Sequence, residues 1–189
     1  MIEKWRFHLL GLVTLLIFPL PALWALWYFE DISPTQVLAL DEFFSAYTLI
    51  GLQLGFFYAL FIIAITQLSV FSEAGRLQEK MLHSLSLNWL DVFLISFAAG
   101  FGEEILFRAG IQHWLGPWIT TLIFIALHGY FHPLSWKKSL YGVVIFPFIL
   151  LLAFGYEKYG LWFCIAAHFS YDLLLLSRVR SKSPSINDR

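Results

Sequence analysis

Long apolar runs separated by short polar connections divide this sequence into about six segments. A helix needs roughly 20 apolar residues to cross the hydrocarbon core of a bilayer, and all runs but the fourth approach that length. The pattern therefore predicts an all-α fold, a polytopic transmembrane helix bundle of about six spans. In chain order the runs cover residues 7–29, 47–70, 89–112, 117–131, 140–156 and 161–177.

Glycine and proline mark where these predicted helices bend or end. The Gly116-Pro117 pair is expected to end the third helix, since this dipeptide is typical of a turn. Pro19 and Pro21 lie inside the first run and are expected at most to kink it. Between the second and third runs, residues 71–88 alternate charged and apolar positions with helical spacing. They are predicted to form an amphipathic helix at the membrane surface.

Composition places the chain in the integral-membrane class. Hydrophobic residues make up 59% of its 189 positions and charged residues only 13%, against about 25% charged residues in soluble domains. A net charge of -1 gives no indication of nucleic-acid binding, and a lone cysteine, Cys164, excludes a disulfide framework. We expect a single membrane domain, residues 1–189, in the plasma (inner) membrane of a bacterium.

The basic residues favour one orientation in the membrane. Cytoplasmic connections are enriched in Lys and Arg, and almost all of these residues fall on one side if the N-terminus is cytoplasmic. The bias predicts that both termini are cytoplasmic and that Glu103 and Glu104 lie in the outer half of the bilayer. The residues on the cytoplasmic side would be Lys4, Arg6, Arg76, Lys80, Lys137, Lys138, Arg178, Arg180, Lys182 and Arg189.

Three ionisable residues interrupt the third run, where each costs several kcal/mol and therefore needs a partner or a function. Glu104 and Arg108 are four residues apart, so they share a helix face and can form an ion pair. Glu103 points about 100° away and would be free to act as a general base. The alternative is that all three are structural and lie at a helix end near the headgroups.

Two further runs carry histidine. His128 is in the fourth run, and a lone buried histidine is more often structural than functional. In the sixth run His168 and Asp172 are four residues apart, so the carboxylate could orient the imidazole, as is common for working histidines. If these helices converge with Glu103, they form a site in which water is the nucleophile. The zinc-protease motif HExxH is absent from the sequence.

Three short motifs, in this order, resemble the CPBP family of intramembrane proteases, which includes the type II CAAX prenyl proteases. They are Glu103-Glu104-x-x-x-Arg108, Phe124-x-x-x-His128 and His168-x-x-x-Asp172. The resemblance covers residues 89–178, which it implies are the catalytic core. Residues 1–88 would then be two accessory spans and the interfacial segment, and residues 179–189 a disordered basic tail.

The resemblance implies a role for each motif residue. Glu103 and His128 would activate the attacking water, and His168 with Asp172 would stabilise the oxyanion or position the scissile carbonyl. Glu104, Arg108 and Phe124 would hold the geometry of the site. Asp172 stands where the family often has Asn, so we assign it to orienting His168; if protonated, it could instead donate a hydrogen bond.

Family members have been described both as metal-free glutamate proteases and as metalloproteases. We favour the metal-free mechanism here. If a zinc ion is bound, the resemblance implies that its ligands are Glu103, His128 and His168.

The expected activity is hydrolysis of a peptide bond near the hydrophobic or lipidated C-terminus of a membrane-associated protein. The charge bias suggests that this substrate approaches from the outer face or within the bilayer. One alternative is a non-catalytic membrane protein that binds a peptide, as a bacteriocin immunity factor would. Another is a small transporter or proton relay, although the sequence shows no repeat symmetry to support it.

Overall fold

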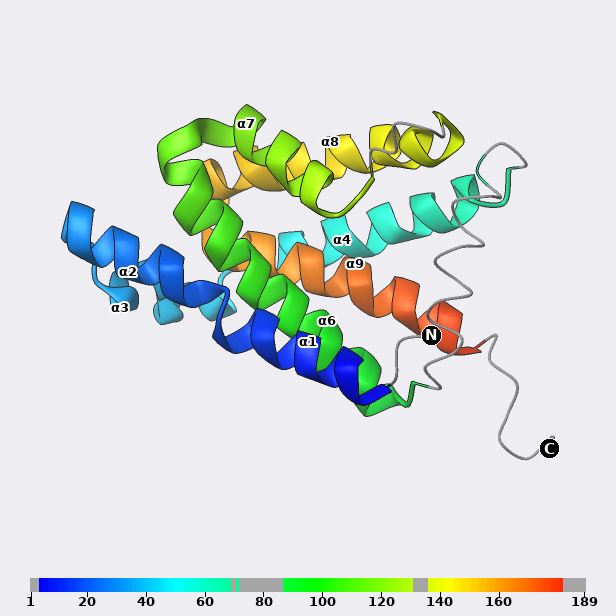
Figure 1. Ribbon diagram of the computed structural model, residues 1–189, viewed down its shortest axis with the longest axis horizontal. Helices are drawn as coiled ribbons and strands as arrows, with labels where there is room; N and C mark the ends of the chain where they lie inside the picture. Colours follow the sequence, from blue (N-terminus) through cyan, green and yellow to red (C-terminus); the bar gives the residue numbers. More distant parts are fainter. Residues whose placement is uncertain (1–3, 69–70, 72–86, 131–135, 182–189) are drawn as a thin grey trace.

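The computed structural model describes residues 4–68, 71, 87–130 and 136–181. Within these residues the chain is entirely helical, as predicted (Figure 1). The predicted interfacial helix, residues 71–88, lies almost wholly outside them. The helices are α1 (Lys4–Leu16), α2 (Pro19–Glu30), α3 (Pro34–Leu38), the 3₁₀ helix η1 (Leu40–Phe44), α4 (Ala46–Ile65), α6 (Trp89–Glu104), the π-helix η3 (Ile105–Ile111), α7 (Gln112–Leu127), α8 (Trp136–Tyr159) and α9 (Leu161–Ser181).

Three stretches of the described chain are long and apolar enough to cross a membrane: Lys4–Glu30, Ala46–Ile65 and Ser139–Tyr159. Large apolar side chains such as Trp24, Phe57 and Leu94 remain exposed on the bundle. Exposed apolar surface on this scale marks contact with lipid rather than water. The chain is therefore a membrane protein. Most of its buried polar side chains lie on the remaining helices, although α1 carries the buried Thr14.

Proline and glycine break two of the predicted runs, the first differently than expected and the third as expected. The first run is two helices, because Pro19 starts α2 as its first residue, where a missing N–H costs nothing. The third run passes through the π-helix η3 and breaks at Gly116-Pro117, as predicted. Gly116 has a non-helical backbone, with a φ of 71°, so α7 consists of two helical pieces joined across a kink.

The end of one helix and the structure of one connection also differ from the prediction. Helix α9 continues to Ser181, beyond the start of the tail predicted at residue 179. Its last turn carries Arg178 and Arg180, and cations there complement the helix dipole. The polar connection after α2 contains the short helix α3, which Ser33 begins with a capping box that includes Gln36.

Helix α9 lies at the centre of the bundle, between α4 and α6 (Figure 1). Helix α4 runs in the same direction, since Ser170 Oγ donates to Leu52 O at 2.9 Å and Arg178 bonds Ile63 O near the ends of both helices. Helix α6 runs in the opposite direction, with Trp89 at its start beneath the guanidinium of Arg180. This packing places the middle of α6 against the middle of α9.

Gly55 allows α4 and α9 to approach closely. A Cβ at this position would overlap the carbonyl oxygen of Ala167 and the hydroxyl of Ser170. Small residues at such positions are typical of packed membrane helices. The central helix pair thus depends on the absence of a side chain here.

We expect Gly55→Ala to destabilise the protein by about 1–3 kcal/mol, because α4 must move away from α9 to admit the methyl group. Thermal unfolding in detergent micelles would measure the loss. Gly11→Ala is the matched control, since its Cβ would meet Ile95 at an ordinary 3.6 Å. Equal melting temperatures for the two variants would contradict the expectation.

The two ends of the bundle differ in charge. One end, which we call the basic end, holds Lys4, Arg178 and Arg180, with Lys4 paired to Asp91 at 2.6 Å. The other, the acidic end, holds Glu30, Glu42 and Glu157. Contacts between helix ends fix this assignment: Glu30 lies 3.6 Å from His113, Tyr47 lies against Tyr159, and Trp162 bonds the carbonyl of Leu38.

Candidate active site

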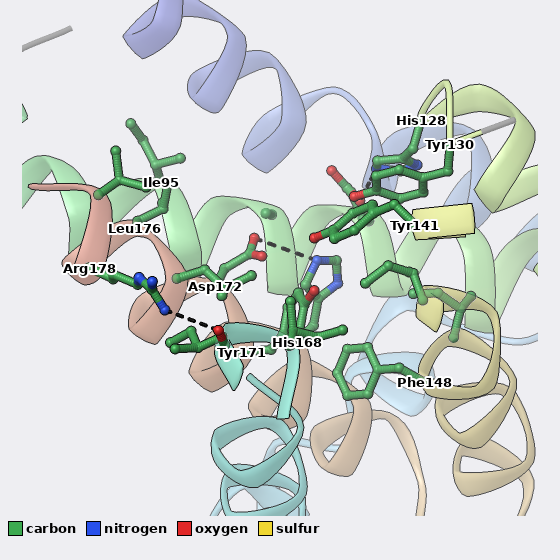
Figure 2. Close-up of a pocket in the computed structure, with 18 of the residues that line it drawn as sticks. Ile95, His128, Tyr130, Tyr141, Phe148, His168, Tyr171, Asp172, Leu176 and Arg178 are labelled. Atoms are coloured by element: carbon green, nitrogen blue, oxygen red, sulfur yellow. Dashed lines mark hydrogen bonds and ion pairs between the residues drawn. The ribbon is translucent and has the colours of Figure 1, made fainter. Parts of the chain in front are cut away.

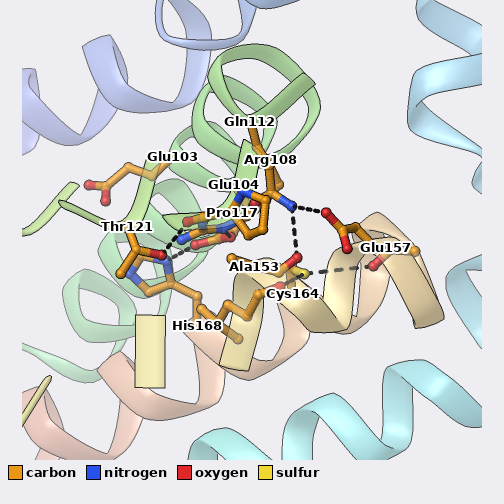
Figure 3. A network of polar contacts seen from close by, with 12 residues as sticks. Glu103, Glu104, Arg108, Gln112, Pro117, Thr121, Ala153, Glu157, Cys164 and His168 are labelled. Atoms are coloured by element: carbon orange, nitrogen blue, oxygen red, sulfur yellow. Dashed lines mark hydrogen bonds and ion pairs between the residues drawn. The ribbon is translucent and has the colours of Figure 1, made fainter. Parts of the chain in front are cut away.

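Glu104 and Arg108 form a completely buried ion pair near the centre of the bundle. The distance from Arg108 Nε to Glu104 Oε2 is 2.9 Å, and both side chains have 0% exposure (Figure 3). Each charge is therefore stabilised by the other and not by solvent, since neither side chain can reach water. Their pairing four residues apart is the one expected from the sequence, although Arg108 lies on the π-helix.

A polar chain continues from Arg108 towards α8. Arg108 Nη1 donates to Gln112 Oε1 at 3.3 Å, and Gln112 Nε2 donates to Ala153 O at 2.8 Å (Figure 3). The guanidinium also lies over the Phe124 ring, 5.8 Å from its centroid. These contacts fix η3 against α7 and α8. Sequence reasoning missed Gln112, because its partner is 41 residues away along the chain.

The second oxygen of Glu104 holds His168. The distance from His168 Nδ1 to Glu104 Oε1 is 2.7 Å, which is shorter than the 3.6 Å from His168 Nε2 to Asp172 Oδ2. A carboxylate only accepts, so Nδ1 carries the hydrogen and donates it to Glu104. The partner that orients His168 most strongly is thus Glu104, on another helix, while Asp172 faces the other ring nitrogen.

Gly100 makes this contact between α6 and α9 feasible. A Cβ there would lie 2.9 Å from the carbonyl oxygen of Ile165 and 3.0 Å from the backbone nitrogen of Phe169. Both distances are too short for a side chain. The glycine thus lets α6 lie close enough to α9 for Glu104 to reach His168.

Glu103 and His128 form the accessible part of the site. The distance from His128 Nε2 to Glu103 Oε2 is 3.2 Å, and the side chains are 29% and 14% exposed, against 0% for Glu104. The pair lacks the alignment of a hydrogen bond, and Glu103 Oε2 has no hydrogen-bond partner among the described residues. This oxygen can therefore accept a hydrogen bond from a water or a substrate.

The ring of His128 is fixed by Phe124. His128 Nδ1 lies 2.8 Å from Phe124 O, and the two rings stack with centroids 4.0 Å apart. The carbonyl can only accept, so Nδ1 carries a hydrogen and Nε2 faces Glu103. Glu103 and His128 thus present a carboxylate oxygen and an imidazole nitrogen side by side, 3.2 Å apart. Such a pair suits general acid–base chemistry.

A cavity of about 780 Å³ opens in front of these residues (Figure 2). Glu103, His128, His168 and Asp172 line its inner part. Its walls are mostly apolar, and it extends past Leu175 and Leu176 to Gln67, Arg178 and Val179. These last residues lie at the C-terminal ends of α4 and α9, so the cavity extends towards the basic end.

The structure brings the residues of all three motifs into one region. Phe124 joins the four cavity residues named above, whereas Glu104 and Arg108 lie behind them and are fully buried. Three tyrosines that the sequence reading did not single out, Tyr130, Tyr141 and Tyr171, also line the cavity. No local spacing signals them, because they come from three different parts of the chain.

The zinc-ligand set implied by the resemblance is not gathered around one point. Glu103 lies against His128, while Glu104 engages His168 instead. Among the described residues no three His, Cys, Asp or Glu side chains are arranged to hold a metal ion.

Other histidines lie away from the cavity. His8 Nε2 is 2.9 Å from Asp91 at the start of α6, and Asp91 also forms a capping box with Asn88. His113 lies beside Glu30 at the acidic end. His132 lies outside the described residues.

Comparison with known proteins bears on this arrangement. A family model described as "Type II CAAX prenyl endopeptidase Rce1-like" matches residues 85–174. These residues are thus similar to the Rce1-like family. The match confirms the resemblance to the CPBP proteases there, and the region contains all three motifs. It supports a type II CAAX protease-like function.

One curated relative extends the comparison. The Bacillus subtilis (strain 168) protein named "Uncharacterized protein YpbD" is 32% identical over 107 residues, which cover 56% of this chain and 53% of the relative. The chain thus spans about half the length of the curated relative it matches. No solved structure matches the chain.

Proposed function

We propose that this protein is an intramembrane endopeptidase in which Glu103 and His128 activate a water. The observation that carries the proposal is the Glu103–His128 contact at 3.2 Å, facing a cavity in an otherwise apolar bundle. A carboxylate with an open lone pair beside an imidazole is the arrangement that a general base requires. The similarity of residues 85–174 to the Rce1-like family supports a protease of this kind.

In the proposed reaction, the water oxygen attacks the scissile carbonyl carbon while Glu103 takes one proton from the water. The carbonyl π electrons move to oxygen and form the oxyanion of a tetrahedral intermediate. When the C–N bond breaks, the proton held between Glu103 and His128 passes to the leaving nitrogen. The products are a carboxylic acid and an amine, and the Glu103–His128 pair returns to its starting state.

His168 and Asp172 would border the other side of the scissile bond. His168 is fixed by Glu104, and Glu104 is fixed by Arg108, so the imidazole is held from behind by a buried ion pair. We infer that this chain of contacts positions the substrate carbonyl against Glu103. Pre-organised groups of this kind lower a barrier because they need no reorientation during the reaction.

The proposed substrate is a protein with a hydrophobic or lipidated C-terminus. The cavity is lined largely by apolar side chains such as Ile62, Ile145 and Leu175, which would accept an apolar peptide or a lipid chain. The matched family is described as a type II CAAX prenyl endopeptidase, and this description favours such a substrate. We favour a metal-free mechanism in a bacterial plasma membrane, with the lipid bilayer as the solvent for both enzyme and substrate.

We further propose that the basic end is cytoplasmic, by the preference of Lys and Arg for that side. The described helices pass back and forth so that α1 begins and α9 ends there, which supports six spans with cytoplasmic termini. Because the cavity extends towards this end, access from the cytoplasmic side is favoured over the outer-face approach suggested by the charge pattern.

Cysteine labelling in membrane vesicles tests this access. We expect Gln67→Cys, at the cavity end of α4, to react with an impermeant maleimide only from the cytoplasmic side. Leu115→Cys, near the opposite end, should react only from outside. The native Cys164 is completely buried and should stay unlabelled. Labelling of Gln67→Cys from outside would overturn the proposed orientation.

The activity itself is tested with purified protein in proteoliposomes. The probes are a farnesylated peptide with a C-terminal CAAX sequence, an unprenylated copy and a hydrophobic transmembrane peptide, each with a quenched fluorophore pair. We expect cleavage of at least one probe and no effect of a chelator. Tight binding of a peptide without cleavage would instead favour the non-catalytic alternative, and loss of cleavage with the chelator would overturn the metal-free mechanism.

A further inference from the structure

The two ends of the cavity carry opposite charge. Its inner end holds two carboxylates, those of Glu103 and Asp172, beside the two imidazoles. Its other end is lined by Arg178, the only Lys or Arg among the described residues of the cavity wall. Between these ends the wall is mostly apolar, as at Leu175 and Leu176. An anion that enters the cavity is therefore repelled from the inner end and attracted to Arg178.

Arg178 is held at its end of the cavity by the last turn of α4. Its Nη1 donates to Ile63 O at 3.3 Å, and Gln67 Nε2 donates to the same oxygen at 3.0 Å. The Arg178 side chain is half-buried. A guanidinium has five N–H donors, so it can hold a backbone carbonyl and a carboxylate at the same time. The packing of α9 on α4 thus fixes a positive charge where the cavity meets the basic end.

Helix α9 sets the distance between this charge and the proposed catalytic residues. At 1.5 Å per residue, Arg178 lies about 9 Å beyond Asp172 and about 15 Å beyond His168 along the helix axis. Figure 2 shows Arg178 and His128 on opposite sides of Asp172. An extended peptide covers about 3.3–3.6 Å per residue. Only a few residues therefore separate a carbonyl at Glu103 from a group at Arg178.

A free peptide C-terminus would bring one obligatory negative charge into this cavity. The proposed substrate is cut near its C-terminus, so its α-carboxylate must lie a short distance from Glu103. A carboxylate is costly to bury without a partner, and the C-terminal ends of α4 and α9 add partial negative charge at the basic end. A guanidinium matches the planar shape of a carboxylate better than an ammonium does. Arg178 meets both needs of such a terminus, its charge and its position.

We propose that Arg178 binds the free α-carboxylate of the substrate and so makes the enzyme selective for chain ends. This inference rests on the proposed peptidase function. The contact forms when the substrate binds and persists through the reaction, because it lies away from the scissile bond. Arg178 is thus a specificity residue and not part of the catalytic pair. A peptide terminus is favoured over a lipid headgroup, because Arg178 and Glu103 line one continuous cavity.

Two forms of one peptide test the inference on the wild-type protein. The cleaved probe is made with a free C-terminal carboxylate and with a C-terminal amide, and its fluorophore and quencher are placed on side chains. We expect kcat/KM to be about 10- to 100-fold higher for the acid, as for loss of hydrogen bonds to a charged group. The difference should lie in KM, with kcat within about twofold, because the contact is equal in the ground and transition states. Equal kcat/KM for acid and amide would contradict the inference.

The variant Arg178→Gln should abolish this preference. It should raise KM for the acid by a similar factor and leave the amide nearly unchanged, so the two changes are not additive. Arg180→Gln is the matched control, because Arg180 lies on the same helix over the Trp89 ring and does not line the cavity. It should keep the full preference. Equal losses for acid and amide in Arg178→Gln would show a merely structural role and overturn the inference.

Two further arms cover a folding defect and a lipid ligand. If Arg178→Gln does not fold, Arg178→Lys replaces the planar fork by a point charge and should lower the acid preference several-fold; an unchanged preference would refute the role of Arg178. The assay is also run in phosphatidylcholine vesicles with and without phosphatidylglycerol. An effect of Arg178→Gln that follows the anionic lipid and not the peptide terminus would assign Arg178 to a headgroup and overturn the inference.

Binding measurements separate this inference from the function on which it rests. Fluorescence anisotropy with Glu103→Gln reports recognition of the two peptide forms without cleavage. If the wild type cleaves both forms equally and Glu103→Gln binds both equally, the role of Arg178 is wrong and the peptidase proposal stands. If the wild type cleaves no probe but binds the acid at least about tenfold more tightly, and Arg178→Gln removes that difference, the peptidase proposal falls and the carboxylate site stands.

Discussion

Glu103→Gln should lower the rate of peptide cleavage by about 10³-fold, within the range that general acid–base catalysis contributes. The amide has nearly the same shape as the carboxylate but cannot take a proton from water. It also removes the negative charge that lies 3.2 Å from His128 Nε2. The rate is measured with the cleaved fluorogenic peptide in proteoliposomes.

Glu42→Gln provides the control for the same chemical change. Glu42 is exposed at the acidic end, away from the cavity, so its substitution should leave the rate unchanged. The melting temperature of Glu103→Gln should match that of the wild type, since this side chain is not part of the buried ion pair. More than a tenth of the wild-type rate in a well-folded Glu103→Gln protein would remove Glu103 as the base.

Arg108→Met should destabilise the protein by about 3–5 kcal/mol, because it leaves the buried Glu104 carboxylate without its counter-charge. Both side chains have 0% exposure, so no water can compensate. Methionine fills much of the same volume, which keeps the effect electrostatic rather than steric. Equilibrium unfolding in mixed micelles would measure the change.

The double variant Glu104→Gln/Arg108→Met separates charge from packing. It removes both charges, so it should regain part of the stability that Arg108→Met loses. Arg6→Met, on an exposed arginine of α1, should have little effect. A double variant less stable than Arg108→Met alone would show that the pair does not act through charge.

The helical class and the general position of the apolar runs could be predicted from hydropathy, because bilayer thickness dictates both length and composition. Breaks inside the runs were harder to predict. The sequence does mark Pro19, but whether a proline kinks a helix or starts a new one depends on what packs against it. The π-helix η3 leaves no local pattern at all, whereas the break between the third and fourth runs was correctly predicted from the Gly116-Pro117 dipeptide.

The site was predictable where partners are neighbours on one helix, as with Glu104 and Arg108. It was not predictable where partners come from different helices, because rotation and depth of packing decide those contacts. The sequence assigned Asp172 to orient His168, whereas Glu104, which is 64 residues away, makes the shorter contact. Gln112 and Tyr130 were missed for the same reason.

The π-helix makes the length of the chain between Glu104 and Gln112 critical. A π-turn is an α-helix that holds one additional residue, and η3 spans Ile105–Ile111. Deleting one residue there would restore regular winding but rotate the helix that follows, as far as the break at Gly116, by about 100°. Gln112 would then leave α8. The spacing between Glu104 and Gln112 therefore cannot drift by a single residue, unlike the spacing across a loop.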